Sequence, residues 1–219
     1  MAAKDRSSRS PRLSPAQQES PATLSSEELA RRHVQIEREA RMARELAAQR
    51  LLNEGARLLR TQRPAEALAP LQQAYELAPD DPDVAVTLGG ALVMSGKWSA
   101  AVGFLEAAVE QHPENARLLL NLAAAHLGRL EFSSFAAQER AIGVYKRAIE
   151  VDPVAENAHY SIGLIYAERQ DWPEAESWFQ AALRAYPNDA DAGLWLRRTR
   201  AAQMTPPPES PDSEARSEE

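Results

Sequence analysis

Four prolines recur at nearly regular intervals and divide most of the chain into segments of similar length. Pro79, Pro113, Pro153 and Pro187 stand 34, 40 and 34 residues apart. In a chain this rich in Ala, Leu, Glu and Arg, such a period is typical of stacked repeats, each too small to bury a core alone. The spacing therefore predicts an all-helical, repetitive scaffold.

The residues between the prolines also recur in phase. Each repeat has one small residue and, sixteen or more positions later, one bulky residue. The small residues are Gly55, Gly89, Ala123 and Gly163, and the bulky ones are Leu71, Leu105, Tyr145 and Phe179. Where two helices of a hairpin cross, a small residue lets the backbones approach and a bulky neighbour fills the space between them. Each repeat is therefore expected to be a helix, a turn and a second helix that ends before the proline.

In the type and spacing of these positions the chain resembles the tetratricopeptide repeat family. The resemblance implies an all-α fold, a right-handed superhelical α-solenoid of helix-turn-helix repeats. The four expected repeats are residues 48–81, 82–115, 116–155 and 156–189. The third carries a six-residue insertion near residues 131–137, which either lengthens the loop between its helices or adds turns to one of them.

An N-terminal helical extension is expected over residues 24–47. Ser25 precedes Glu28 by three positions, the spacing of a capping box that starts a helix. The residues that follow have a spacing close to a heptad: Leu29, His33, Ile36, Ala40, Ala43 and Ala47. The spacing is that of a coiled coil, but the stripe thins to alanine, which argues against one.

The end of the solenoid is expected to be covered by a capping helix. Residues 190–204 resemble the first helix of a repeat, but no second helix follows. Leu194 and Trp195 are expected on its buried side. The outermost segments, 1–23 and 205–219, are rich in Ser, Pro and charged residues, and we expect them to be disordered.

Composition excludes several classes of function. The chain has no cysteine, so disulfides and thiolate-bound zinc are excluded. No apolar run approaches the length of a membrane helix, which predicts a soluble, cytoplasmic protein without membrane insertion. The net charge of -7 and the acidic repeats argue against nucleic-acid binding.

The sequence contains no catalytic constellation. Its four histidines occur singly, without a second metal ligand at helical spacing. Gly96 and Lys97 lack both the earlier glycine and the following Ser or Thr of a phosphate-binding loop. We therefore predict no enzymatic activity, no cofactor and no metal site.

The resemblance implies that the first helices line a concave groove that holds a peptide or an amphipathic helix of a partner protein. It places the second, fifth, ninth and twelfth residues of each repeat, and some of their neighbours, on this side. The groove candidates are Leu52, Asn53, Val86, Thr87, Val93, Met94, Arg117, Leu120, Asn121, Leu127, Asn157, Tyr160, Ser161 and Leu164. The same apolar positions also serve packing in ordinary repeats.

Two functions from different classes follow. The first is a non-catalytic scaffold or adaptor that binds a partner's segment in the groove. The alternative is a self-assembling structural protein that forms a homo-oligomer through residues 25–54, which either form an intermolecular coiled coil or dock in a groove. One known use of the family groove, a clamp for a chaperone's terminal carboxylate, is not expected, since only Asn121 matches that pattern in the second to fourth repeats.

Overall fold

The computed structural model describes residues 25–155 and 157–204. Within these residues the chain forms nine α-helices, one 3-10 helix and no strand, which confirms the predicted all-α fold. The helices are α1 (Ser26–Arg60), α2 (Pro64–Leu77), α3 (Pro82–Met94), α4 (Trp98–Gln111), α5 (Ala116–Leu127), η2 (Leu130–Phe132), α6 (Phe135–Val151), α7 (Ala158–Glu168), α8 (Trp172–Ala185) and α9 (Ala190–Met204). The segments expected to be disordered, 1–23 and 205–219, lie outside the described residues.

The chain divides into two compact parts, residues 1–43 and 44–219. The described residues of the first part belong to the start of α1, which begins with the predicted capping box. The Glu28 N–H donates to Ser25 Oγ at 3.2 Å, and the Ser25 N–H donates to the Glu28 carboxylate at 2.8 Å. The hydrogen bonds that the Glu28 carboxylate receives, first from the Ser25 backbone and second from its side chain, hold the pKa of Glu28 below its ordinary value.

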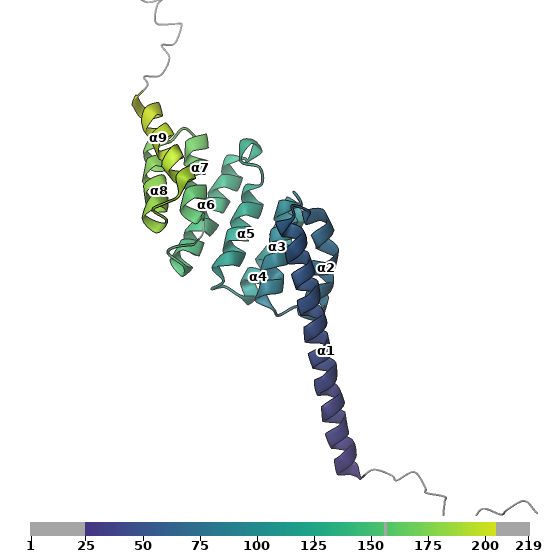
Figure 1. Ribbon diagram of the computed structural model, residues 1–219. Coiled ribbons are helices and arrows are strands. Elements are labelled where there is room, and N and C mark those ends of the chain that lie inside the picture. Colours follow the sequence, from purple (N-terminus) through teal and green to yellow (C-terminus); the bar gives the residue numbers. More distant parts are fainter. Residues whose placement is uncertain (1–24, 156, 205–219) are drawn as a thin grey trace, which may run out of the picture. The chain divides into compact units, whose positions relative to one another are not determined.

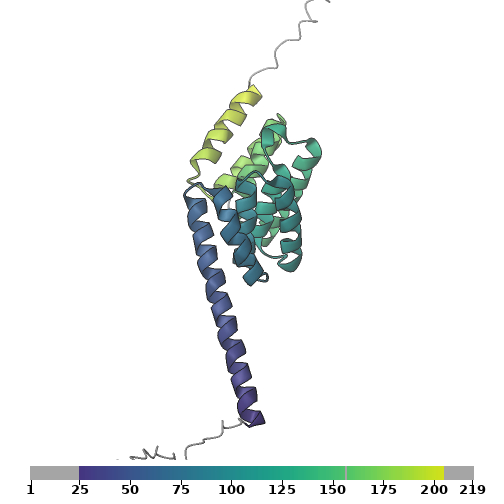
Figure 2. The same ribbon diagram turned by 90° about the vertical axis from the view of Figure 1, so that its right-hand side faces the viewer.

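In the second part, successive helices pack against each other in chain order, from α2 to α9 (Figures 1 and 2). The last turns of α1 and α2 form the first hairpin, followed by α3 with α4, α5 with α6, and α7 with α8. The second helices α2 and α8 have Pro64 and Pro173 in their first turn, where the missing N–H costs no helical hydrogen bond.

Small and bulky residues meet where the hairpin helices cross, as the sequence predicts. A Cβ atom added to Gly89 would lie 2.3 Å from Leu105 Cδ2, and one added to Gly55 would lie 2.4 Å from Leu71 Cγ. Both leucines are fully buried. The glycines therefore allow a close approach of two backbones that an alanine would prevent without repacking.

The six extra residues of the third repeat both lengthen the loop and extend a helix. The loop contains η2, and α6 has 17 residues, compared with 14 in each of α2, α4 and α8. Phe135 at the start of α6 is 67% exposed, and the Arg169 guanidinium lies 4.2 Å from the centre of its ring. Arg169 Nε also donates to Gln138 Oε1 at 2.6 Å, which ties the insertion to α7.

The prediction for the buried side of α9 is wrong in part. Trp195 stacks on Phe179 of α8 with ring centres 6.0 Å apart, but Leu194 is 38% exposed. The fully buried residues are instead Ala192 and Thr199. These two are seven positions apart and share a helix face, so Leu194, two residues after Ala192, points away from that face.

Candidate functional site

A groove of about 500 Å³ crosses the first helices of all four hairpins. It is lined by residues of α1, α3, α5 and α7, by Asn157 at the N-cap of α7, and by one residue of the second helix α6. The lining residues are Ala56, Leu59, Val86, Thr87, Gly90, Arg117, Leu120, Asn121, Tyr145, Asn157 and Ser161. The periodic use of the first helices follows from the repeat, since each hairpin presents the same helix to the same side.

The structure brings together half of the fourteen residues that were proposed from the sequence. Those lining the groove are Val86, Thr87, Arg117, Leu120, Asn121, Asn157 and Ser161. The other residues of first helices that line the groove are Ala56, Leu59 and Gly90, which occupy the ninth and twelfth positions of their repeats.

The remaining seven candidates do not line this groove. Leu52 is 8% exposed and belongs to the core, and Val93 and Leu127 pack half-buried against that core. Tyr160 and Leu164 pack against the cluster around Phe179. Asn53 and Met94 are exposed. Most of these positions therefore serve helix packing, as the alternative interpretation of the apolar rows allowed.

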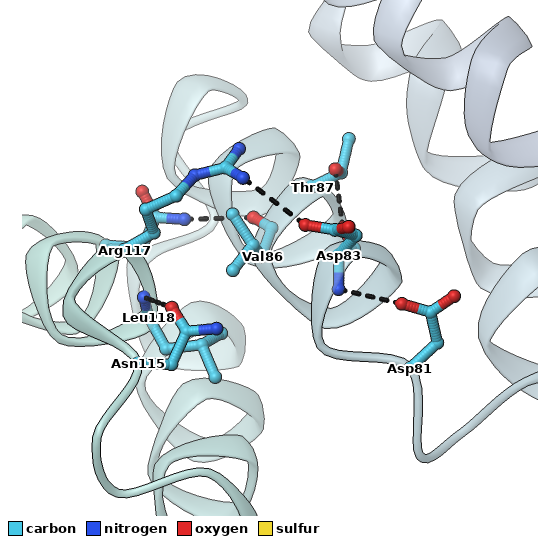
Figure 3. A network of polar contacts seen from close by, with 8 residues as sticks. Asp81, Asp83, Val86, Thr87, Asn115, Arg117 and Leu118 are labelled. Carbon is cyan, nitrogen blue, oxygen red and sulfur yellow. Dashed lines mark hydrogen bonds and ion pairs between the residues drawn. The ribbon is translucent and has the colours of Figure 1, made fainter.

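Polar contacts join α3 and α5 at one wall of the groove (Figure 3). Asn121 Nδ2 donates to the Val86 carbonyl oxygen at 2.9 Å, and Arg117 Nη1 lies 3.3 Å from Asp83 Oδ1. On α3, Thr87 Oγ1 donates to the Asp83 carbonyl oxygen at 2.7 Å. A fixed amide beside an apolar floor limits the side-chain entropy that ligand binding would cost.

Tyr145 is the lining residue that the sequence did not indicate. It stands where the other repeats have Leu71, Leu105 and Phe179, so it was expected only to pack. Its side chain is indeed buried, and its hydroxyl group lies near Ser161 on α7. Burial raises the pKa of Tyr145 and Ser161 lowers it by a smaller amount, so the phenol stays neutral at neutral pH. The signal for this role was the change from Leu or Phe to a residue with a hydroxyl group.

Arg117 is the charged residue among those that line the groove. Its ion pair with Asp83 is open to solvent, with the two side chains 67% and 71% exposed. Because exposed pairs contribute little, we expect Arg117→Ala to change the free energy of unfolding by less than about 0.5 kcal/mol. Urea unfolding followed by circular dichroism checks this; a loss of several times that size would mean that Arg117 holds α5 against α3.

Two half-buried histidines predict how stability depends on pH. Burial lowers the pKa of both His126 and His159; Arg140 lowers that of His126 further while Glu106 opposes it, and Arg184 lowers that of His159. The unfolded chain therefore takes up protons more readily than the folded one. The neutral histidines therefore contribute fully to the free energy of unfolding above the pKa of 6.5 that they have in the unfolded chain. This contribution is lost as the pH falls through their lower pKa values in the folded chain.

We accordingly expect the free energy of unfolding to decrease between pH 7 and pH 5. A double variant, His126→Gln with His159→Gln, is expected to have a flatter dependence over this range, because the carboxyl groups titrate mainly below it. Urea unfolding at several pH values measures both proteins. Equal slopes for the two would contradict the assignment.

None of the helices in residues 25–155 and 157–204 combines the length and the apolar character that crossing a membrane requires.

Comparison with known proteins places these observations in a family. Two tetratricopeptide repeat models match the chain, one over residues 58–119 and the other over residues 139–190, and together they cover more than half of it. No curated protein matches significantly. The helical hairpins, the groove on the first helices and both models thus agree on one kind of repeat.

Solved structures of tetratricopeptide proteins have the same fold. PilF of Pseudomonas aeruginosa is 20% identical with a TM-score of 0.63, over 74% of this chain and 71% of PilF. MamA of Desulfovibrio magneticus RS-1, residues 41 to the end, is 21% identical with a TM-score of 0.58, over 72% and 85%. TTC0263, a thermophilic tetratricopeptide protein of Thermus thermophilus, is 21% identical with a TM-score of 0.52, over 73% and 100%. At these identities the likeness concerns the fold alone. The chain belongs to the tetratricopeptide repeat family.

Proposed function

We propose that the chain is a non-catalytic adaptor whose groove binds a segment of a partner protein, either an extended peptide or an amphipathic helix. Proteins of this family are generally scaffolds for protein interactions, which supports the general class. The observation that carries the proposal is the groove of about 500 Å³ to which all four first helices contribute. A concave surface with an apolar floor and a few fixed polar groups is the usual form of such a binding site.

The groove is apolar at its α1 end and polar at its α7 end, and this difference supports a preferred placement of the bound segment. At α1 it is lined by Ala56 and Leu59, and at α7 by Asn157 and Ser161 together with the neighbouring Tyr145. An apolar side chain of the partner is favoured at the α1 end, where burial provides the binding energy. Main-chain groups of the partner are favoured at the α7 end, where amides and hydroxyl groups can hydrogen-bond with them.

The segment should carry little net charge. Arg117, the charged lining residue, is already paired with Asp83 on the rim. A strongly acidic or basic segment would therefore find no unpaired opposite charge in the groove. Its charged groups would still lose their hydration on binding. We infer a neutral segment with one or two large apolar side chains.

Affinity purification with mass spectrometry tests this proposal. The wild-type protein is compared with Leu120→Glu, which puts a charge in the floor of the groove, and with Ala107→Glu, which puts the same charge on an exposed site of α4. A partner that binds in the groove is recovered with the wild type and Ala107→Glu but not with Leu120→Glu. Recovery by all three proteins rejects the groove as the site.

A second candidate function is self-association through α1, and one observation favours it. Every residue from Ser25 to Leu46 is exposed, although Leu29, Ile36 and Met42 among them are large and apolar. In proteins, most of the stability of a helix comes from packing of its apolar face. Light scattering on the full chain and on a chain without residues 1–45 separates the candidates, since equal monomeric masses would leave no support for self-association.

A non-catalytic role and a cytoplasmic location remain predictions from the sequence. Both agree with a repeat scaffold, and neither is needed for the groove proposal.

A further inference from the structure

The first helix is much longer than its repeat requires. The other first helices, α3, α5 and α7, have 13, 12 and 11 residues, whereas α1 has 35. The extra length lies at its N-terminal end, where all side chains up to Leu46 are exposed. A helix of this kind is usually stabilised by packing of an apolar stripe against another helix.

The stripe on this helix follows a heptad. With Leu29 and Ile36 at d positions, His33 and Ala40 fall at a positions and Ala43 at the next d position. Leu29 and Ile36 are 54% and 55% exposed, so their apolar surface is available. The alanines are small enough to let a second helix approach closely.

The residues beside the stripe carry charges that complement a second copy of the same helix. The g positions are Arg32 and Glu39, and the e positions that follow them are Glu37 and Arg44. In a parallel, in-register pair, each g residue faces the e residue five positions later on the other helix. Arg32 then faces Glu37 of the second copy, and Glu39 faces Arg44 of the second copy. Every such pair joins opposite charges.

These side chains are free to exchange partners. Glu37 contacts His33 at 3.1 Å and Glu39 accepts a hydrogen bond from Gln35 at 2.6 Å, both within one helix turn. All four residues are exposed, and contacts of this kind between exposed side chains contribute little to stability. Replacing them by contacts to a second helix therefore costs little.

We propose that the N-terminal part of α1 forms a parallel, in-register two-stranded coiled coil with a second copy of this chain. The inference rests on the second candidate function, self-association through α1, and adds the identity of the partner, the direction and the register. The pairing leaves the groove residues outside the contact, since the stripe involves only residues 29–44.

Charge exchange tests the pairing on the full chain. One variant carries Glu37→Arg and Glu39→Arg, which makes all four flanking residues basic. The other carries Arg32→Glu and Arg44→Glu, which makes them acidic. The control carries Arg31→Glu and Arg38→Glu, which reverses two charges off the stripe, at f positions. Light scattering at low ionic strength, where surface charges are least screened, gives the mass of each protein and of mixtures.

The expected results are specific. The wild type and the control have twice the mass of the 24.1 kDa chain at high concentration. Each charged variant alone has the mass of one chain, and an equimolar mixture of the two has twice that mass. A wild type that is monomeric at all concentrations overturns self-association itself. A wild-type dimer that the charge reversals do not affect, or a mixture that stays monomeric, leaves self-association standing and overturns this pairing.

Cysteine cross-linking tests the direction and register. The chain has no cysteine of its own, so a single one can be introduced without a background. Ile36→Cys at a d position is expected to form a disulfide-linked dimer under oxidation, because in-register helices bring the two thiols together. Arg38→Cys, on the outer side, is expected to give none. Cross-linking of the outer cysteine alone overturns the parallel arrangement, as does the absence of any cross-link at Ile36→Cys in a protein that is still dimeric.

Discussion

Replacing Gly163 by alanine is expected to lower the free energy of unfolding by about 2–3 kcal/mol, the cost of overpacking a tight helix crossing. The added Cβ atom would lie 2.7 Å from Phe179 Cε1 and 2.8 Å from Cδ1. Phe179 is fully buried, and its ring stacks on Trp195, so it has little room to move. The helix crossing itself must open.

A matched control separates this effect from helix propensity. Gly143 lies inside α6, is exposed, and has no atom within 4 Å of an added Cβ. Gly143→Ala should therefore raise the free energy of unfolding by about 0.5–1 kcal/mol, because alanine is the better helix former. Urea unfolding followed by circular dichroism measures both. If the two substitutions changed stability in the same direction, the small-to-bulky crossing would not be the feature that restricts Gly163.

The second large effect is expected at Leu118, which is fully buried in the core. Leu118→Ala leaves a cavity in this core and should cost about 3–5 kcal/mol. Leu120, two residues further on the same helix, is half-buried and lines the groove. Leu120→Ala should cost only about 1 kcal/mol, since less apolar surface returns to water. Urea midpoints of the two variants check this, and equal losses would mean that Leu120 is a packing residue.

Much of the fold could be predicted because each repeat needs particular residue types at fixed positions, for steric reasons. A proline ends each second helix, and glycine or alanine is needed where helices cross, so Gly89 and Leu105 could be paired before the structure was known. The capping box at Ser25 is equally local. Features of this kind depend on neighbours at a fixed spacing in the chain.

The errors concern features that depend on how one element is rotated against another. Leu194 is apolar, but the rotation of α9 is set by Ala192 and Thr199 against α8, which composition does not reveal. Five of the fourteen groove candidates pack against neighbouring helices for the same reason, since most of them occupy fifth or twelfth positions, near the border between the groove and the core. Tyr145 was missed because its ring packs while its hydroxyl group meets Ser161.

The most direct test is the affinity of the groove for the segment of the partner that affinity purification identifies. Calorimetric titration of that segment compares the wild type with Leu120→Glu and Ala107→Glu, after circular dichroism has established equal helicity. We predict that Leu120→Glu weakens binding about 30-fold or more, which corresponds to the loss of a central contact worth about 2 kcal/mol. Ala107→Glu should bind like the wild type. Equal affinity of all three proteins would contradict the groove as the binding site.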